Sequence, residues 1–177
     1  MSEDRRPAPG DYDPYYADYI DALDDGPILA RLVEQGDRLR TLLAGLGPSG
    51  ADHRYAPDKW SIKEMIGHLA DAERVFGMRA TCIARGEIAP LPGFEQDDYV
   101  QQGGFGRRTL DSLLRELELL RGANVEMFAA LSDEAWERRG TASGSPVTVR
   151  AIAWILAGHL EHHVGVLRDR YGDAFAG

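Results

Sequence analysis

Cysteine is almost absent from this sequence, since Cys82 is the only one among 177 residues. A single thiol cannot form an internal disulfide, and we expect the chain to work in a reducing compartment, the cytoplasm. No run approaches the ~20 consecutive apolar residues that a membrane span needs. The segment 1–16 contains no apolar stretch typical of a signal peptide. The sequence therefore predicts a cytoplasmic protein without a membrane partner.

Positive charge is also scarce. The chain holds 20 Lys and Arg against 29 Asp and Glu, which gives a formal net charge of −9. A protein that binds the phosphate backbone needs a basic face. Basic residues gather only in short pairs, such as Arg107–Arg108 and Arg138–Arg139. We therefore expect no nucleic-acid partner.

Signals for β-strands are few. The alternation in SPVTVR is short, and GTASGSP before it is typical of a loop. Four segments instead carry apolar residues at the three-and-four spacing of a helix face. They span about residues 27–46, 61–86, 109–131 and 147–171. We expect one all-α domain over residues 1–177, a four-helix bundle preceded by an extended lead-in (1–25) with a short helical turn at YYADYI.

The link between the second and third helices, residues 86–108, is long and rich in Gly, Pro and Gln. A structureless link of this length is unusual inside a small domain. Two bundle helices that point the same way need a connection that travels the length of the bundle. The link therefore predicts an up-down-down-up order with a long crossover between helices two and three.

Histidines provide the candidate chemistry. His159 and His163 are four residues apart in the fourth helix, so their side chains lie on one face about 5–6 Å apart. Two imidazoles at this spacing can reach one metal ion. In the predicted topology the second and fourth helices are antiparallel, which places His68 and His163 at the same depth, ~10–12 Å from one bundle end. The three histidines are therefore predicted to form one metal site.

Each histidine also has a simpler interpretation. A single histidine on an apolar helix face, such as His68, is more often a hydrogen-bonded core residue, and pairs four apart also occur on surfaces. His162 lies on the flank of the same face, and His53 lies in a polar loop without an assigned role. Cys82 lies ~21 Å along the helix from His68 and cannot share its site.

Two carboxylates close to His68 in the sequence have both structural and functional interpretations. Glu64 completes a capping box with Ser61, and Asp71 is placed to pair with Arg74 on the surface. Both could instead accept a hydrogen bond from a ligand histidine. The metal-site motifs HExxH, Glu-x-x-His and CxxC are absent.

Three segments together resemble the DinB-like family, named for DNA-damage-inducible proteins. They are WSIKEMIGHLADAERVFGMRA, LPGF-x-x-DDYV and AGHLEHHVGVLRDRY, and the resemblance covers about residues 12–171. It implies a four-helix bundle with a zinc or nickel site formed by one histidine of helix two and two of helix four, here His68, His159 and His163. It also implies a homodimer, which exposed positions at Val33 and Leu119 would favour. Relatives include thiol-dependent S-transferases and a thiol-dependent maleylpyruvate isomerase.

Three neutral imidazoles would leave a divalent ion its full charge and one open position, because the sequence shows no fourth ligand at this depth. We therefore expect a metal-dependent enzyme of the thiol-dependent S-transferase type, acting on a small-molecule substrate with a low-molecular-weight thiol. Hydrolysis is the lesser option. The alternative is a non-catalytic metal-binding stress-response protein in which the ion stabilises the bundle. An interaction module ranks last, because it leaves the matched depth of the histidines unexplained.

Overall fold

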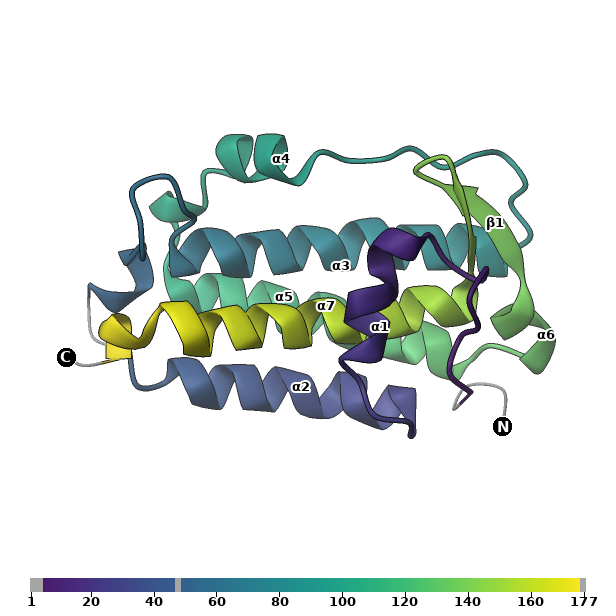
Figure 1. The fold of residues 1–177 in the computed structure, drawn as a ribbon, viewed down its shortest axis with the longest axis horizontal. Coiled ribbons are helices and arrows are strands. Elements are labelled where there is room, and N and C mark those ends of the chain that lie inside the picture. Colours follow the sequence, from purple (N-terminus) through teal and green to yellow (C-terminus); the bar gives the residue numbers. More distant parts are fainter. Residues whose placement is uncertain (1–4, 47–48, 176–177) are drawn as a thin grey trace.

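The fold is described from a computed structural model that covers residues 5–46 and 49–175. The described residues form four long helices, α2 (Ile28–Leu43), α3 (Ile62–Ala84), α5 (Leu110–Ala129) and α7 (Val149–Arg170). They pack side by side along the longest axis of the molecule (Figure 1). The predicted four-helix bundle is therefore confirmed. None of the described helices is long and apolar enough to cross a membrane.

The order of the helices is up-down-down-up, as predicted from the long link. Helices α2 and α7 run in one direction, and α3 and α5 run in the other (Figure 1). The chain leaves α3 at one end of the bundle and returns over its length before α5 begins (Figure 1). The crossover follows from this parallel pair, because consecutive parallel helices cannot be joined by a short turn.

The crossover is not structureless, and that part of the prediction was wrong. It contains the helix α4 (Gln96–Gly103) and the 3-10 turn η4 (Phe105–Arg107). Phe105 is 7% exposed, and its ring lies against α3 at Gly67. A Cβ atom at Gly67 would lie 2.3 Å from that ring, so glycine at this position admits Phe105. This contact holds the segment that follows α4 against α3.

The expected loop at GTASGSP is instead a two-stranded hairpin, so the absence of strands was also a wrong prediction. Strand β1 (Arg139–Ala142) pairs antiparallel with β2 (Ser145–Thr148). The two turn residues, Ser143 and Gly144, have φ angles of 53° and 80°. Two left-handed residues in a two-residue turn match the twist of a hairpin. The backbone N–H of Leu91 donates to Thr141 O at 2.8 Å, which attaches the crossover to the hairpin.

The lead-in carries the helical turn expected at YYADYI, as the 3-10 turn η2 (Pro14–Tyr16) and the helix α1 (Ala17–Asp21). Figure 1 shows α1 lying across α7. The close approach depends on Gly158 of α7, where a Cβ atom would lie 2.0 Å from the carbonyl oxygen of Tyr19. The remaining short elements are η3 (Gly50–Asp52), α6 (Asp133–Glu137) and η5 (Gly172–Phe175).

Side-chain caps fix the starts of the two helices that carry the histidines. Ser61 and Glu64 form the predicted capping box of α3, with the Ser61 N–H donating to Glu64 Oε2 at 2.7 Å. Thr148 caps α7, accepting from the N–H of Ala151 at 3.1 Å. Each cap satisfies a backbone donor that the first turn leaves unpaired, which contributes about 1 kcal/mol.

The core divides into two apolar clusters, one toward each end of the bundle. Along α7, Ala157 belongs to one cluster and Leu160 to the other. Between them lies a buried polar layer at mid-height of the bundle. Its members outside the histidines are Gln35 of α2, Glu73 of α3 and Arg121 of α5. The predicted site lies in this polar layer.

Candidate metal centre

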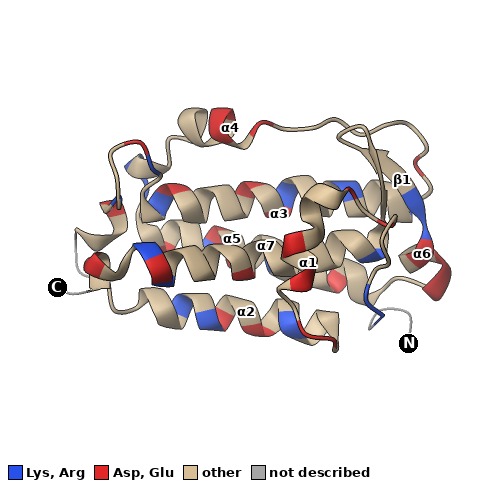
Figure 2. Cartoon of the chain, viewed as in Figure 1, with Lys and Arg blue, Asp and Glu red and all other residues tan. Residues whose placement is uncertain are grey.

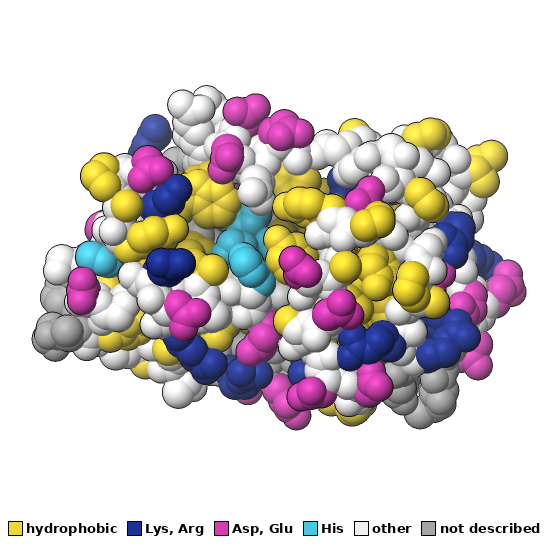
Figure 3. Space-filling model, in the orientation of Figure 1, with side chains coloured by type: hydrophobic (Ala, Val, Ile, Leu, Met, Phe, Trp, Pro, Cys, Tyr) yellow, Lys and Arg dark blue, Asp and Glu magenta, His cyan; other side chains and the backbone are white. Residues whose placement is uncertain are grey.

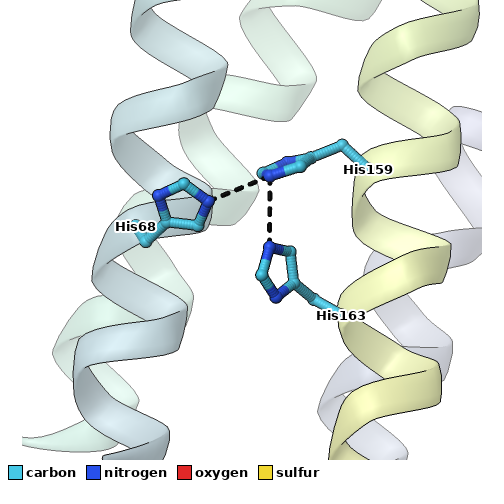
Figure 4. A group of neighbouring side chains, drawn as sticks. All are labelled: His68, His159 and His163. Atoms are coloured by element: carbon cyan, nitrogen blue, oxygen red, sulfur yellow. Dashed lines mark hydrogen bonds between the residues drawn. The ribbon is translucent and has the colours of Figure 1, made fainter. Parts of the chain in front are cut away.

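His68 of α3 and the pair His159 and His163 of α7 meet between the two helices, as predicted. Figure 4 shows the three rings pointing toward one another from the two facing helices. Their exposed fractions are 2%, 6% and 9%. The antiparallel arrangement of α3 and α7 brings residues 91 positions apart into contact. The matched depth inferred from the spacing is therefore present in the fold.

The three Nε2 atoms form an unusual set of contacts. Nε2 of His159 lies 2.9 Å from Nε2 of His68 and 3.1 Å from Nε2 of His163. A ring nitrogen carries either one proton or one in-plane lone pair. It can therefore satisfy only one of two such neighbours. The neighbours of His159 therefore compete for one proton or one lone pair, and the triad can form only one well-directed hydrogen bond at this atom.

The environment keeps all three imidazoles neutral. Burial lowers the pKa of His68 from 6.5 to about 4 and the pKa of His163 to about 3, and neighbouring His162 adds to both shifts. The pKa of His159 is lowered well below 6.5, chiefly by burial and further by the other histidines and Arg121. A neutral imidazole offers the lone pair that a metal ion needs.

The donor set fits one divalent ion. A tetrahedral zinc site with Zn–N distances of about 2.0–2.1 Å separates its nitrogens by about 3.3–3.4 Å. The contacts from His159 would open by only a few tenths of an ångström to reach that spacing. Among the described residues, these three histidines are the only group of three or more His, Cys, Asp or Glu whose ligand atoms lie within 4.8 Å of one another. An ion would also remove this competition, because it would accept the Nε2 lone pair of each of the three rings.

The other candidate residues from the sequence lie outside this group. His162 is exposed and its ring lies against Tyr19, with centroids 5.3 Å apart. Cys82 contacts Met78 instead, with their sulfur atoms 3.8 Å apart. Asp71 pairs with Arg74 at 3.4 Å, as expected for a surface ion pair.

Glu64 and His53 likewise have contacts that do not involve the triad. The Glu64 carboxylate accepts hydrogen bonds from Ser61 and Arg54. The ring of His53 lies 6.2 Å from that of Tyr171. Neither carboxylate near His68 in the sequence therefore accepts from a ligand histidine.

Aromatic rings enclose the triad on two sides, and the histidine spacing gave no sign of them. The Trp60 ring lies 4.8 Å from that of His68, and the Tyr19 ring lies 5.5 Å from that of His159. Trp60 directly precedes the N-cap of α3, and Tyr19 is carried in by α1. Their segments were visible in the sequence, but their contact with the histidines depends on the packing of loops against the bundle.

Two cavities border the triad, and each has at least one of the three histidines in its wall. The first, about 500 Å³ in volume, is named here the tyrosine cavity, and its wall includes Tyr15, Tyr16, Tyr19, Phe76, His68 and His159. The second, about 520 Å³, is named the Trp60 cavity, and its wall includes Tyr55, Lys59, Trp60, Asp97, His163 and Tyr171. Figure 3 shows histidine side chains in a hollow near the middle of this face. Figure 2 shows acidic residues on both α1 and α4, which border this face.

A buried ion pair lies behind the triad in the polar layer. Arg121 of α5 pairs with Glu73 of α3 at 2.6 Å, and both side chains are at least 93% buried. Arg121 also donates to Gln35 Oε1, and Gln35 in turn donates to the carbonyl of Ala157 on α7 at 2.9 Å. These bonds connect all four bundle helices at the depth of the histidines. They fix the spacing of α3 and α7, on which the triad depends.

Comparisons with known proteins concern the family and the fold of the chain. The sequence profile of the DinB superfamily matches residues 31–167. No curated protein matches the chain significantly. Among solved structures, the chain is similar to YfiT from Bacillus subtilis, described as a probable metal-dependent hydrolase with an unusual four-helix bundle topology. The TM-score is 0.75 at 16% identity, over 82% of this chain and 85% of that chain, a likeness that concerns the fold. The match to the profile over most of the sequence confirms the family resemblance, and the chain belongs to the DinB superfamily.

Proposed function

We propose that this protein is a metal-dependent enzyme that holds one divalent ion, zinc or nickel, on His68, His159 and His163. The observation that carries the proposal is the convergence of three buried, neutral Nε2 atoms that cannot satisfy one another by hydrogen bonding. Imidazole ligands suit zinc, nickel, copper and iron alike, so the choice of zinc or nickel rests on the family.

We further propose that the reaction is the transfer of a small thiol to an electrophilic carbon. When bound, a divalent ion would supply the positive charge that favours the thiolate form of a thiol at the triad. The thiol proton leaves to solvent or to His162, whose exposed ring lies 5.1 Å from that of His163. The sulfur electron pair then forms the C–S bond, and the leaving group departs with the electrons of the bond that breaks.

The two cavities support a reaction between two organic molecules. His68 and His159 line the tyrosine cavity, whereas His163 lines the Trp60 cavity. The volume of each cavity is within the range of small-molecule sites, about 300–1,000 Å³. A thiol in one cavity and an electrophile in the other would meet at the triad. A hydrolase needs only one such cavity, because its second reactant is water.

Hydrolysis is the second candidate, favoured by the fold's likeness to a protein described as a probable metal-dependent hydrolase. The usual partner of a metal site in hydrolysis is a carboxylate that accepts a proton from water. No described carboxylate belongs to the group of ligand atoms at the triad. The carboxylates that line the two cavities, such as Glu95 and Asp97, are exposed to solvent. We therefore favour a nucleophile that is more acidic than water, such as a thiol.

The test is to load the purified protein with zinc or nickel and to supply small thiols together with model electrophiles. We expect thioether formation that His163→Ala abolishes and the matched control His53→Ala retains. Release of the leaving group without thiol would instead support hydrolysis. If neither reaction exceeds that of metal-free protein while the metal is retained, the non-catalytic metal-binding alternative is favoured.

A further inference from the structure

Arg79 of α3 is a buried cation, 2% exposed, and none of the ion pairs in the described ranges includes it. The carboxylate of Asp13 lines a small pocket together with Arg79 but forms no ion pair with it. Its guanidinium donates to the carbonyl of Pro92 at 2.7 Å and to Ser143 Oγ at 2.9 Å, and its Nε has no partner. Burying a charge is costly unless an opposite charge or strong acceptors compensate it.

The position of Arg79 connects it to the tyrosine cavity. It follows His68 by eleven residues, and at 3.6 residues per turn the two positions differ by only about 20° around the helix. Ala72 and Phe76, between them on this face, line the cavity. The guanidinium carbon lies 5.2 Å from the centre of the Phe76 ring. Arg79 therefore lies at the end of the cavity away from the histidines.

Two hydroxyl groups in the cavity wall lie next to Arg79. Tyr16 and Ser143 both line the cavity, and Arg79 donates to Ser143 Oγ at 2.9 Å and lies near the Tyr16 hydroxyl, whose pKa its charge lowers against the larger effect of burial. Arginine has donors and no acceptor, so a hydroxyl oxygen that bonds to it can only accept. Each hydroxyl proton then remains to be donated to a third group. Two hydroxyl donors backed by one guanidinium form a binding site for an anion.

We propose that the tyrosine cavity binds an elongated organic carboxylate, with its charged end at Tyr16 and Ser143 and its other end at His68 and His159. The eight residues from His68 to Phe76 span about 12 Å at 1.5 Å per residue, which sets the length of the ligand. Glu95 also lines the cavity, but it is exposed, so salt and solvent screen its repulsion. Asp13 lies near Tyr16 as well, and its carboxylate is engaged by hydrogen bonds from Tyr15 N–H and Ser145 Oγ. The inference rests on the proposed function for the role of the histidine end.

The experiment measures binding without turnover. Isothermal titration calorimetry of metal-free and zinc-loaded protein is made with acetate, butyrate, hexanoate and octanoate, and with octanamide as the uncharged control. We expect the longer carboxylates to bind to both forms at least tenfold more tightly than acetate and octanamide. Equal affinity for octanoate and octanamide would overturn the proposal, because the anion would then not be recognised.

Variants locate the charged end. Tyr16→Phe combined with Ser143→Gly removes both donors, and glycine suits the φ of 53° at Ser143. This pair should weaken octanoate binding at least tenfold, whereas Tyr15→Phe, the same change in another tyrosine of the cavity wall, should not. Unchanged affinity in the double variant would refute the proposed site. Because binding is measured without metal or thiol, it can succeed where thiol transfer fails, and the two proposals are tested separately.

Discussion

Replacing His159 with leucine is expected to leave the metal-free protein about as stable as wild type and to abolish its stabilisation by zinc. The reason lies in the contacts of its Nε2, 2.9 Å from Nε2 of His68 and 3.1 Å from Nε2 of His163, of which only one can be a well-directed hydrogen bond. A buried polar group without a partner costs about 1–3 kcal/mol. Leucine removes the histidine that causes the conflict and fills a similar volume with an apolar side chain.

The expected stabilisation by zinc follows from the coupling between metal binding and folding. An ion present at one hundred times its dissociation constant stabilises the folded state by about 2.7 kcal/mol. For a domain of this size, 1 kcal/mol shifts Tm by about 2–4 °C. Zinc should therefore raise the Tm of wild type by about 5–11 °C. The same addition should leave the Tm of His159→Leu unchanged.

The assay is differential scanning calorimetry with and without zinc, with His53→Ala and His162→Ala as controls that keep the response to metal. A metal-free His159→Leu protein that unfolds about 10 °C below wild type, together with no zinc response in wild type, would refute the reasoning. The triad would then be an ordinary hydrogen-bonded part of the core. If His162→Ala lost the metal and His163→Ala kept it, the assignment of the pair on α7 would be wrong.

Three further predictions follow from the same structure, and a fourth, the homodimer, rests on the family resemblance. In metal-free protein, the pKa of His68 is about 4 in the folded state and 6.5 in the unfolded state. Below pH 6.5 the unfolded state therefore binds a proton that folded His68 does not, and the free energy of unfolding falls by about 1.4 kcal/mol per pH unit as the pH drops toward 4. Urea unfolding at several pH values measures this loss. Glu73→Gln should lower the free energy of unfolding by about 3–5 kcal/mol, because it leaves Arg121 buried without its partner. Gly158→Ala should displace α1 and carry Tyr19 away from the site, which circular dichroism and crystallography would show as a retained bundle with a moved lead-in. Light scattering at micromolar concentration should report a homodimer, and a monomer would count against that expectation.

Helix spacing predicted the parts of the fold that depend on local pattern. Apolar periodicity located the four bundle helices, and the length of the segment after α3 indicated the parallel pair. The same reasoning predicted that His68 and His163 lie at the same depth, because depth along a helix can be counted from its ends. These predictions succeed because the apolar face of each helix determines which of its residues are buried.

Features that depend on contacts between loops and the bundle were not predictable in this way. The hairpin 139–148 is short, and its pairing is stabilised by the crossover at Leu91, a partner distant in the sequence. Helix α4 was missed because the segment after it is held by the contact of Phe105 with Gly67, which is distant in the sequence. Arg121 was missed because a charged residue in an amphipathic helix is normally exposed. Its buried partner Glu73 could be recognised only once α3 and α5 were aligned.

The central position of α7 has a consequence for synthesis of the protein on the ribosome. Helix α7 packs against α1, α2 and α3, and it is made after all of them. Domains form from the N-terminus as the chain emerges at about 5–20 residues per second. Until residues 149–170 have been made, the earlier helices expose the apolar faces that α7 will cover, and His68 has neither of its two partners. The nascent chain therefore depends on protection from aggregation until late in translation, and metal capture by the complete triad can only follow the last bundle helix.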